Sequence, residues 1–164
     1  MRKLLVAVAI VAFGFAGFSQ QMNDYMEVSR AALKTEKKAM IAEVMELSKE
    51  ESEPFWALYN EFQGKLYTVN TEYLKIVNEF ADNYDNMTEE MAAGLMKRMF
   101  AYESDILKLK KSYHTKFMKF LSAQKTLMYF QAENKISNLV KYEIAQTIPL
   151  LDAGDSKKES KKKK

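Results

Sequence analysis

Apolar residues recur every three or four positions along two long stretches of the chain. The first stripe consists of Phe55, Leu58, Phe62, Leu66, Val69, Tyr73, Ile76 and Phe80. The second consists of Met91, Leu95, Met99, Tyr102, Ile106, Leu109, Tyr113, Phe117 and Phe120. Such spacing, sustained over several turns, predicts amphipathic helices that each bury one face.

Turn-forming residues are scarce in and between these stripes. Residues 22–151 contain only two glycines and two prolines, namely Gly64, Gly94, Pro54 and Pro149. Strands need frequent turns, which glycine and proline usually mark. The sequence therefore predicts an all-α fold of four helices, near residues 24–46, 49–83, 88–120 and 122–148.

The second helix has a clear start and one irregular position. Ser48 follows Leu47, and Glu51 stands three positions later, the spacing of a capping box in which each side chain satisfies a free backbone N–H group. Pro54 lies six residues into this helix, where it removes a hydrogen bond and clashes with the preceding turn. Either the helix is kinked there or Ser52 caps a later start; we favour the kink.

The third and fourth helices are also delimited by capping residues. Thr88 precedes two glutamates, which the positive end of a helix favours. Ser122 follows Leu121 and starts the fourth helix, with Lys125 where a capping box has glutamate or glutamine. Pro149 ends that helix or bends it.

Helix length determines the expected architecture. At 1.5 Å per residue, the second and third helices each reach about 50 Å. We therefore expect an elongated antiparallel hairpin with the shorter helices at its ends, paired with a second copy.

The N-terminus is typical of a secretory signal peptide. Arg2 and Lys3 precede an apolar run from Leu4 to Phe18, which small and polar residues follow. We expect cleavage after Ser19 and a periplasmic location. The alternative is an uncleaved anchor, but the apolar run has 15 residues, and a spanning helix needs about 20.

Cysteine is absent, so a lipid-modified cysteine, disulfides and thiolate chemistry are excluded.

The net charge of +3 is concentrated at the ends, since the residues after Ala153 carry six lysines and two acids. We expect one helical domain over 20–151 and a disordered lysine-rich tail over 152–164. Within the domain, acids dominate from Glu43 to Glu90 and bases from Lys97 to Lys125. Such segregation suggests that the two segments face each other or that one presents a charged binding surface.

Two motifs 74 residues apart repeat one pattern. Leu47-Ser48-Lys49-Glu50-Glu51 matches Leu121-Ser122-Ala123-Gln124-Lys125, and Phe55-Trp56 matches Tyr129-Phe130. Paired Leu-Thr-x-x-Gln motifs that open helices are the signature of the Spy/CpxP family of periplasmic proteins, which this chain resembles. The stretch from Phe55 to Phe62 and the ending Ile148-Pro149-Leu150-Leu151 resemble its Bacteroidetes branch. Serine replaces threonine in both copies, and glutamate or lysine replaces glutamine.

The resemblance implies an α-helical, cradle-shaped dimer that holds unfolded or partly folded proteins without ATP. Relatives also act as envelope-stress sensors, and some bind metal. The branch is associated with extracytoplasmic sigma factors, which implies a membrane-bound regulatory partner as an alternative.

Catalytic motifs find little support. His114 is the only histidine, and a di-iron Glu-x-x-His motif would need an acid where Lys111 stands. No glycine-rich loop is present to hold a nucleotide phosphate. We therefore expect no enzyme, no catalytic residue and no cofactor.

Methionines group at two places: Met22, Met26, Met40 and Met45 in the first helix, and Met87, Met91, Met96 and Met99 at the start of the third. Thioethers ligate Cu(I), and they also fill cores or adapt to varied partners. We favour core packing, and we assign no metal site.

Aromatic and basic side chains supply the candidate binding surface. Trp56, Tyr59 and Tyr67 flank the main stripe, and an exposed apolar face marks an interface with a second copy or with clients. Charge on the basic helix would speed the capture of acidic clients. The candidate client- or partner-binding residues are Trp56, Tyr59, Tyr67, Lys97, Arg98, Lys108, Lys110 and Lys111.

The predicted function is that of a periplasmic, ATP-independent, holdase-like chaperone for unfolded or partly folded envelope proteins. The alternatives are an envelope-stress sensor that partners a sigma-factor system and a metal-binding stress protein. Nucleic acid is not an expected partner, because the chain is exported.

Overall fold

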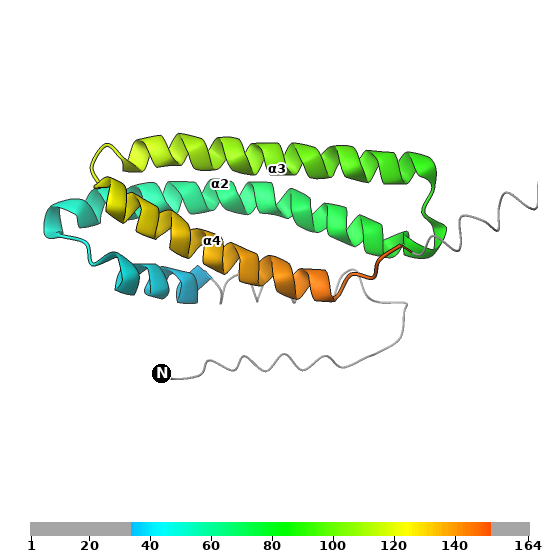
Figure 1. Ribbon diagram of the computed structural model, residues 1–164, viewed down its shortest axis with the longest axis horizontal. Helices are drawn as coiled ribbons and strands as arrows, with labels where there is room; N and C mark the ends of the chain where they lie inside the picture. The colour runs from blue at the N-terminus through cyan, green and yellow to red at the C-terminus, as the bar shows by residue number, and fades with distance from the viewer. Residues whose placement is uncertain (1–33, 152–164) are drawn as a thin grey trace, which may run out of the picture. The chain divides into compact units, whose positions relative to one another are not determined.

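The computed structural model describes residues 34–151, and over that range the prediction of four helices and no strand is confirmed. A first helix covers 34–45; then follow α2 (Lys49–Asp82), the short 3-10 helix η1 (Tyr84–Asn86), α3 (Glu89–Phe117) and α4 (Ala123–Gln146) (Figure 1). Some predictions lie outside the described residues: the signal peptide at 1–19, the start of the first helix at 24, Met22, Met26 and the lysine-rich tail. The elongated cradle and the dimer stay predictions.

The chain divides into a unit that ends at Glu36 and a unit that begins at Lys37. Of the first unit the structure describes only residues 34–36, in the first turn of helix 34–45. All contacts below belong to the second unit.

The three long helices begin where the sequence predicts. Ser48 caps α2, with the complete capping box to Glu51. Thr88 accepts a hydrogen bond from the Met91 N–H at the start of α3, and Ser122 accepts one from the Lys125 N–H at the start of α4. These bonds satisfy N–H groups that have no partner inside the helix.

Two helices end earlier than predicted. α3 stops at Phe117 instead of residue 120, because the Lys119 and Phe120 N–H groups bond to carbonyls only three residues earlier, those of Lys116 and Phe117, in a tight turn. That turn, rather than further helix, directs Leu121 into the core. α4 stops at Gln146 instead of 148, where the Thr147 hydroxyl bonds to the Ile144 carbonyl.

Pro54 lies inside α2 without interrupting it. The helix runs from Lys49, so the alternative in which Ser52 caps a later start is excluded. The proline nitrogen removes the bond that this position would make to the Glu50 carbonyl one turn earlier. The predicted kink stays a prediction.

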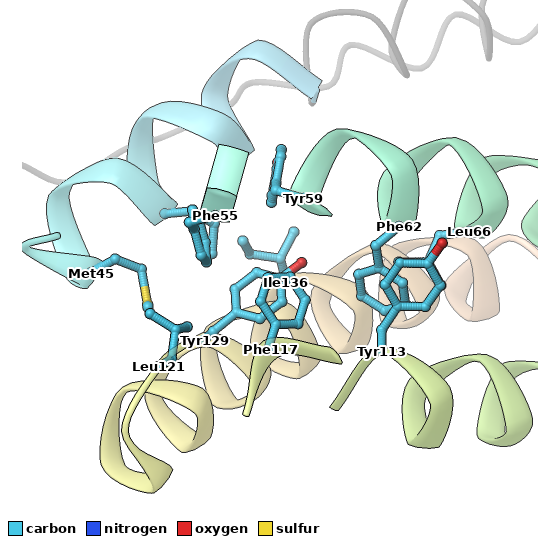
Figure 2. Close-up of a cluster of buried hydrophobic side chains, with 11 residues drawn as sticks. Met45, Phe55, Tyr59, Phe62, Leu66, Tyr113, Phe117, Leu121, Tyr129 and Ile136 are labelled. Carbon is cyan, nitrogen blue, oxygen red and sulfur yellow. The ribbon is translucent and has the colours of Figure 1, made fainter. Parts of the chain in front are cut away.

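Aromatic rings from α2, α3 and α4 form the main core. Phe117 of α3 has its ring centroid 5.5 Å from that of Phe55 on α2 and 4.7 Å from that of Tyr129 on α4 (Figure 2). Helix 34–45 adds Ile41 and Met45, both fully buried. The buried members of this cluster are Ile41, Met45, Phe55, Tyr59, Phe62, Leu66, Tyr113, Phe117, Leu121, Tyr129 and Ile136.

A smaller apolar cluster continues the α2–α3 contact toward η1. Its buried members are Ile76 on α2 and Leu95 and Tyr102 on α3. Tyr102 stacks on Tyr73, with centroids 5.1 Å apart, and its hydroxyl donates to the Asn70 side chain at 3.1 Å. The two predicted apolar stripes therefore meet along much of their length.

The order in which contacting residues follow one another along the chain differs between the pair α2–α3 and the pair α2–α4. Between α2 and α3, Phe55 contacts Phe117 and Asn70 contacts Tyr102, so contacts pair residues in opposite order. Between α2 and α4, Phe55 contacts Tyr129 and Gln63 contacts Glu133, which is the same order.

Within residues 34–151, no helix has the length and apolar character needed to cross a bilayer.

The ring contacts of Phe117 make it a sensitive position for stability. Replacing Phe117, which is fully buried, with alanine should lower the free energy of unfolding by about 3–5 kcal/mol, since apolar contacts are lost and a cavity forms. Phe100→Ala on the exposed face of the same helix should cost less than about 1 kcal/mol. Urea unfolding followed by circular dichroism measures both values. Equal losses for the two variants would contradict the assignment of the core.

Candidate functional site

Of the three candidate aromatic residues, Tyr59 was placed wrongly by the sequence pattern. It does not flank the stripe but lies in the core, 2% exposed, with its ring centroid 6.1 Å from that of Phe55 and 6.1 Å from that of Tyr129 (Figure 2). Its hydroxyl has no hydrogen-bond partner among the described residues. Burial, with a smaller effect of nearby Glu133, raises the pKa of Tyr59 to about 12. A side chain this buried cannot touch a partner without a change in the fold.

Trp56 and Tyr67 are more accessible. Trp56 is half-buried, with its ring centroid 5.0 Å from that of Phe55 and with the Lys38 ammonium 5.2 Å above its ring. Tyr67 is exposed, three turns further along α2. Trp56 thus packs at the margin of the core, whereas Tyr67 lies on the exposed surface of α2.

Two of the five candidate bases are engaged within the chain. Arg98 donates from Nε to Glu72 at 2.9 Å and also binds the Glu79 carboxylate, so it joins α3 to α2. These two carboxylates raise its pKa, with Glu79 the larger cause. Lys110 donates to the Asn134 side chain on α4 at 2.6 Å, and burial lowers its pKa. Arg98 and Lys110 therefore hold helices together.

The other three bases lie together on the outer face of α3. Lys97, Lys108 and Lys111 are all exposed, and within residues 34–151 Lys108 pairs only with Asp105, one turn away on the same helix. Positions 97 and 108 are eleven residues, or about three turns, apart, so they share one face. We call these three residues the basic row.

An apolar row runs beside the basic row, and the sequence reasoning missed it. Met96, Phe100 and Leu107 are 53%, 62% and 53% exposed. They fall at i, i+4 and i+11, which is one face of a helix. A signal was present in the sequence, since none of the three belongs to the main stripe of α3. We call these residues the apolar row.

Acidic and basic segments face each other, as one interpretation of the charge pattern predicted. Glu61 of α2 accepts hydrogen bonds from the Tyr113 hydroxyl at 2.5 Å and from Lys116 of α3 at 3.1 Å. These bonds, the one from Tyr113 first, lower the pKa of Glu61 to about 2. Together with the Arg98 pairs, these contacts use charged side chains to join α2 and α3.

The two repeated motifs meet in space. Lys125, which stands where a capping box would have glutamate or glutamine, binds the Glu51 carboxylate of the first motif and donates to the Glu46 carbonyl at 3.2 Å. Bonds from Lys125, first, and from the Ser48 N–H lower the pKa of Glu51. The next matched pair, Phe55 and Tyr129, is also in contact, at 5.3 Å. The lysine thus completes a link between the repeats.

The methionines of the described residues differ in burial. Met45 is fully buried, and Met87 and Met99 pack against the smaller cluster, as core packing requires. Met96 is exposed, and the exposed His114 has its ring 6.0 Å from that of Phe130. Over 34–151, no group of three or more histidine, aspartate or glutamate side chains is arranged to hold a metal ion.

Comparison of the chain with protein-family models, with curated proteins and with solved structures finds no match.

The depressed pKa of Glu61 gives a pH-dependent contribution to stability. A carboxylate whose folded pKa is about 2, against an ordinary value of 4.5, stabilises the fold above pH 4.5 and loses that effect as the pH falls toward 2. Glu61→Gln should therefore be less stable than the parent at pH 7, and the difference should vanish near pH 2. Urea titrations at four pH values measure it.

Tyr113→Phe is the matched variant, because it keeps the ring packing on Phe62 (4.7 Å) and removes the bond to Glu61. It should show a weaker pH dependence than the parent. Parallel stability profiles for the parent and Glu61→Gln would refute the assignment.

Proposed function

We propose that the chain is a periplasmic, ATP-independent, holdase-like chaperone that binds unfolded or partly folded envelope proteins. The observation that carries this proposal is the outer face of α3, where the apolar row lies beside the basic row. An apolar surface of this kind, next to charged residues, is typical of an interaction site.

The apolar row suits clients of varied sequence. Its three side chains extend over about three turns, roughly 16 Å, enough to contact several residues of an extended segment. Phe100 offers a flat aromatic surface, and Met96 offers a flexible thioether that adapts to different partners. Contacts of this kind bind apolar groups without selecting a particular sequence.

The basic row supports the capture step. Lys97 and Lys111 make no ion pair with other residues in the described range, and Lys108 has only its exposed neighbour Asp105. Exposed charges of one sign attract acidic chains over roughly a Debye length, about 8 Å at physiological salt. In the proposed mechanism the bases speed the first encounter and the apolar row retains the client.

Location and assembly belong to the same proposal. The basic and apolar segment at residues 1–19 supports export to the periplasm. Apolar side chains exposed on α4, Leu139 and Tyr142, offer a second surface on which two copies could pair as a dimer. The α3 face then stays open to clients.

Truncating the apolar row tests retention. A Phe100→Ser, Leu107→Ser double variant should bind an unfolded client about tenfold more weakly, mainly through a faster off-rate, because the loss of two partly buried apolar contacts costs roughly 1.4 kcal/mol. Suppression of the aggregation of an unrelated unfolding protein, without nucleotide, gives the activity. Fluorescence anisotropy gives the affinity.

Leu127→Ser is the matched control, since Leu127 is 67% exposed on α4, away from the apolar row. It should suppress aggregation as the parent does. If the double variant suppresses aggregation as the parent does but sediments as a different oligomer, the apolar row is an assembly surface. That outcome refutes the proposed client site.

Neutralising the basic row tests capture. Lys97→Gln, Lys108→Gln and Lys111→Gln together should slow association with an acidic unfolded client several-fold at low salt. The difference from the parent should shrink between 20 and 300 mM salt, since screening removes long-range attraction (about 30 Å at 0.01 M, about 8 Å at 0.15 M). Stopped-flow kinetics measures both rates. An unchanged on-rate at low salt would contradict the role of the row, and an altered off-rate would assign these lysines to retention instead.

A further inference from the structure

Residues 37–45 contact the rest of the unit through a narrow stripe. Lys37, Ile41 and Met45 fall at i, i+4 and i+8, and all six positions between them are exposed. Ile41 and Met45 are fully buried in the main cluster, where Met45 points toward Leu121 (Figure 2). Two apolar side chains and one ammonium are therefore the only side chains of residues 37–45 that are not exposed.

A buried carboxylate lies under the ammonium. Glu133 of α4 is 2% exposed, and Lys37 Nζ lies 2.5 Å from its Oε1. Gln63 of α2 completes the network, since it accepts from Lys37 at 2.9 Å and donates to Glu133 Oε2 at 2.9 Å. A buried carboxylate without a cation is strongly unfavourable, so this place between α2 and α4 requires a positive group.

The segment is joined to α2 through a strained residue. Glu46 has φ 40°, a left-handed conformation that side chains other than glycine adopt at an energetic cost. Residues 46–48 belong to no helix. Besides the stripe, the segment makes the Lys38 contact over Trp56, 5.2 Å above the ring. Few contacts and a strained connection favour displacement of this segment as a unit.

We propose that the surface between α2 and α4 is a second polypeptide-binding site, which residues 37–45 occupy as an internal ligand. Its preferred ligand is a helical segment with Lys or Arg followed by apolar residues four and eight positions later. The cation meets Glu133 and Gln63, and the apolar pair fills the places of Ile41 and Met45. This site is separate from the outer face of α3 and does not depend on it.

The tethered segment competes with any free ligand. A short connection holds an internal ligand at an effective concentration in the millimolar range. A partner therefore binds measurably only when it carries the same pattern of residues or when the internal segment is weakened. Such competition makes the site selective and keeps it closed at low partner concentration.

A labelled peptide tests the site on the full chain. The probe has the sequence of residues 37–47, and the control peptide carries Lys37→Glu. Lys37→Met in the chain removes the internal cation, so this variant should bind the probe at least tenfold more tightly than the parent does. The control peptide should bind at least tenfold more weakly than the probe. Adding Glu133→Gln to the chain should remove that preference.

Ile41→Ser opens the segment by a second route that leaves the buried charge pair in place, and it too should increase probe binding. Hydrogen exchange of the 37–45 amides reports opening, and circular dichroism reports folding. The proposal fails if exchange rises in both variants but neither binds the probe. It also fails if the variants form dimers by exchanging this segment, since a second copy is then the occupant. Adding Phe100→Ser and Leu107→Ser to any of these chains should leave its affinity for the probe unchanged. This result separates the site from the client surface on α3.

Discussion

The contact of Phe55, Phe117 and Tyr129 is the interaction on which the other features of the described residues depend. One ring comes from each of α2, α3 and α4, and the centroid distances are 5.5, 4.7 and 5.3 Å. Aromatic pairs at such separations are worth about 0.5–1.5 kcal/mol beyond the area they bury. Because these rings fix the relative register of three helices, they also determine which polar side chains meet at the margins of the core.

Those polar contacts have a common arrangement. Arg98, Lys116 and Lys125 each reach a carboxylate on α2, and each lies on an element that the aromatic core already holds in place. The Arg98 and Lys116 pairs are partly open to solvent, and solvent-exposed pairs contribute little to stability, about 0–1 kcal/mol. Their main effect is on specificity: a shift of α3 by one turn against α2 would separate the charges. Glu133 differs, since its burial makes the loss of its cation costly.

The helices could be predicted from sequence because their signals are local. Ser48, Thr88 and Ser122 act within three residues of themselves, and the apolar stripes need only the geometry of one helix. The placement of Tyr59 could not be decided in the same way. Both Leu58 and Tyr59 fit a helical step after Phe55, and packing against α4 decides that Tyr59 is the more buried.

The candidate binding residues show the same limit. Lys97 and Arg98 are neighbours in the sequence, yet one is solvated and the other joins two helices. Only the register of α3 against α2 separates them. The apolar row has a related explanation: Phe100 is out of step with the stripe of Leu95 and Tyr102, and only the packing of α3 shows that this second face is exposed.

Trp56 has a spectroscopic consequence. It is the only tryptophan of the chain, and it lies half-buried where α2 meets Lys38 of the first helix. Indole emission is sensitive to the polarity and charge around the ring, and here the Lys38 ammonium of segment 37–45 lies 5.2 Å from the ring centroid. The protein therefore carries its own fluorophore in contact with that segment, and displacement of the segment could be followed in unlabelled protein in real time.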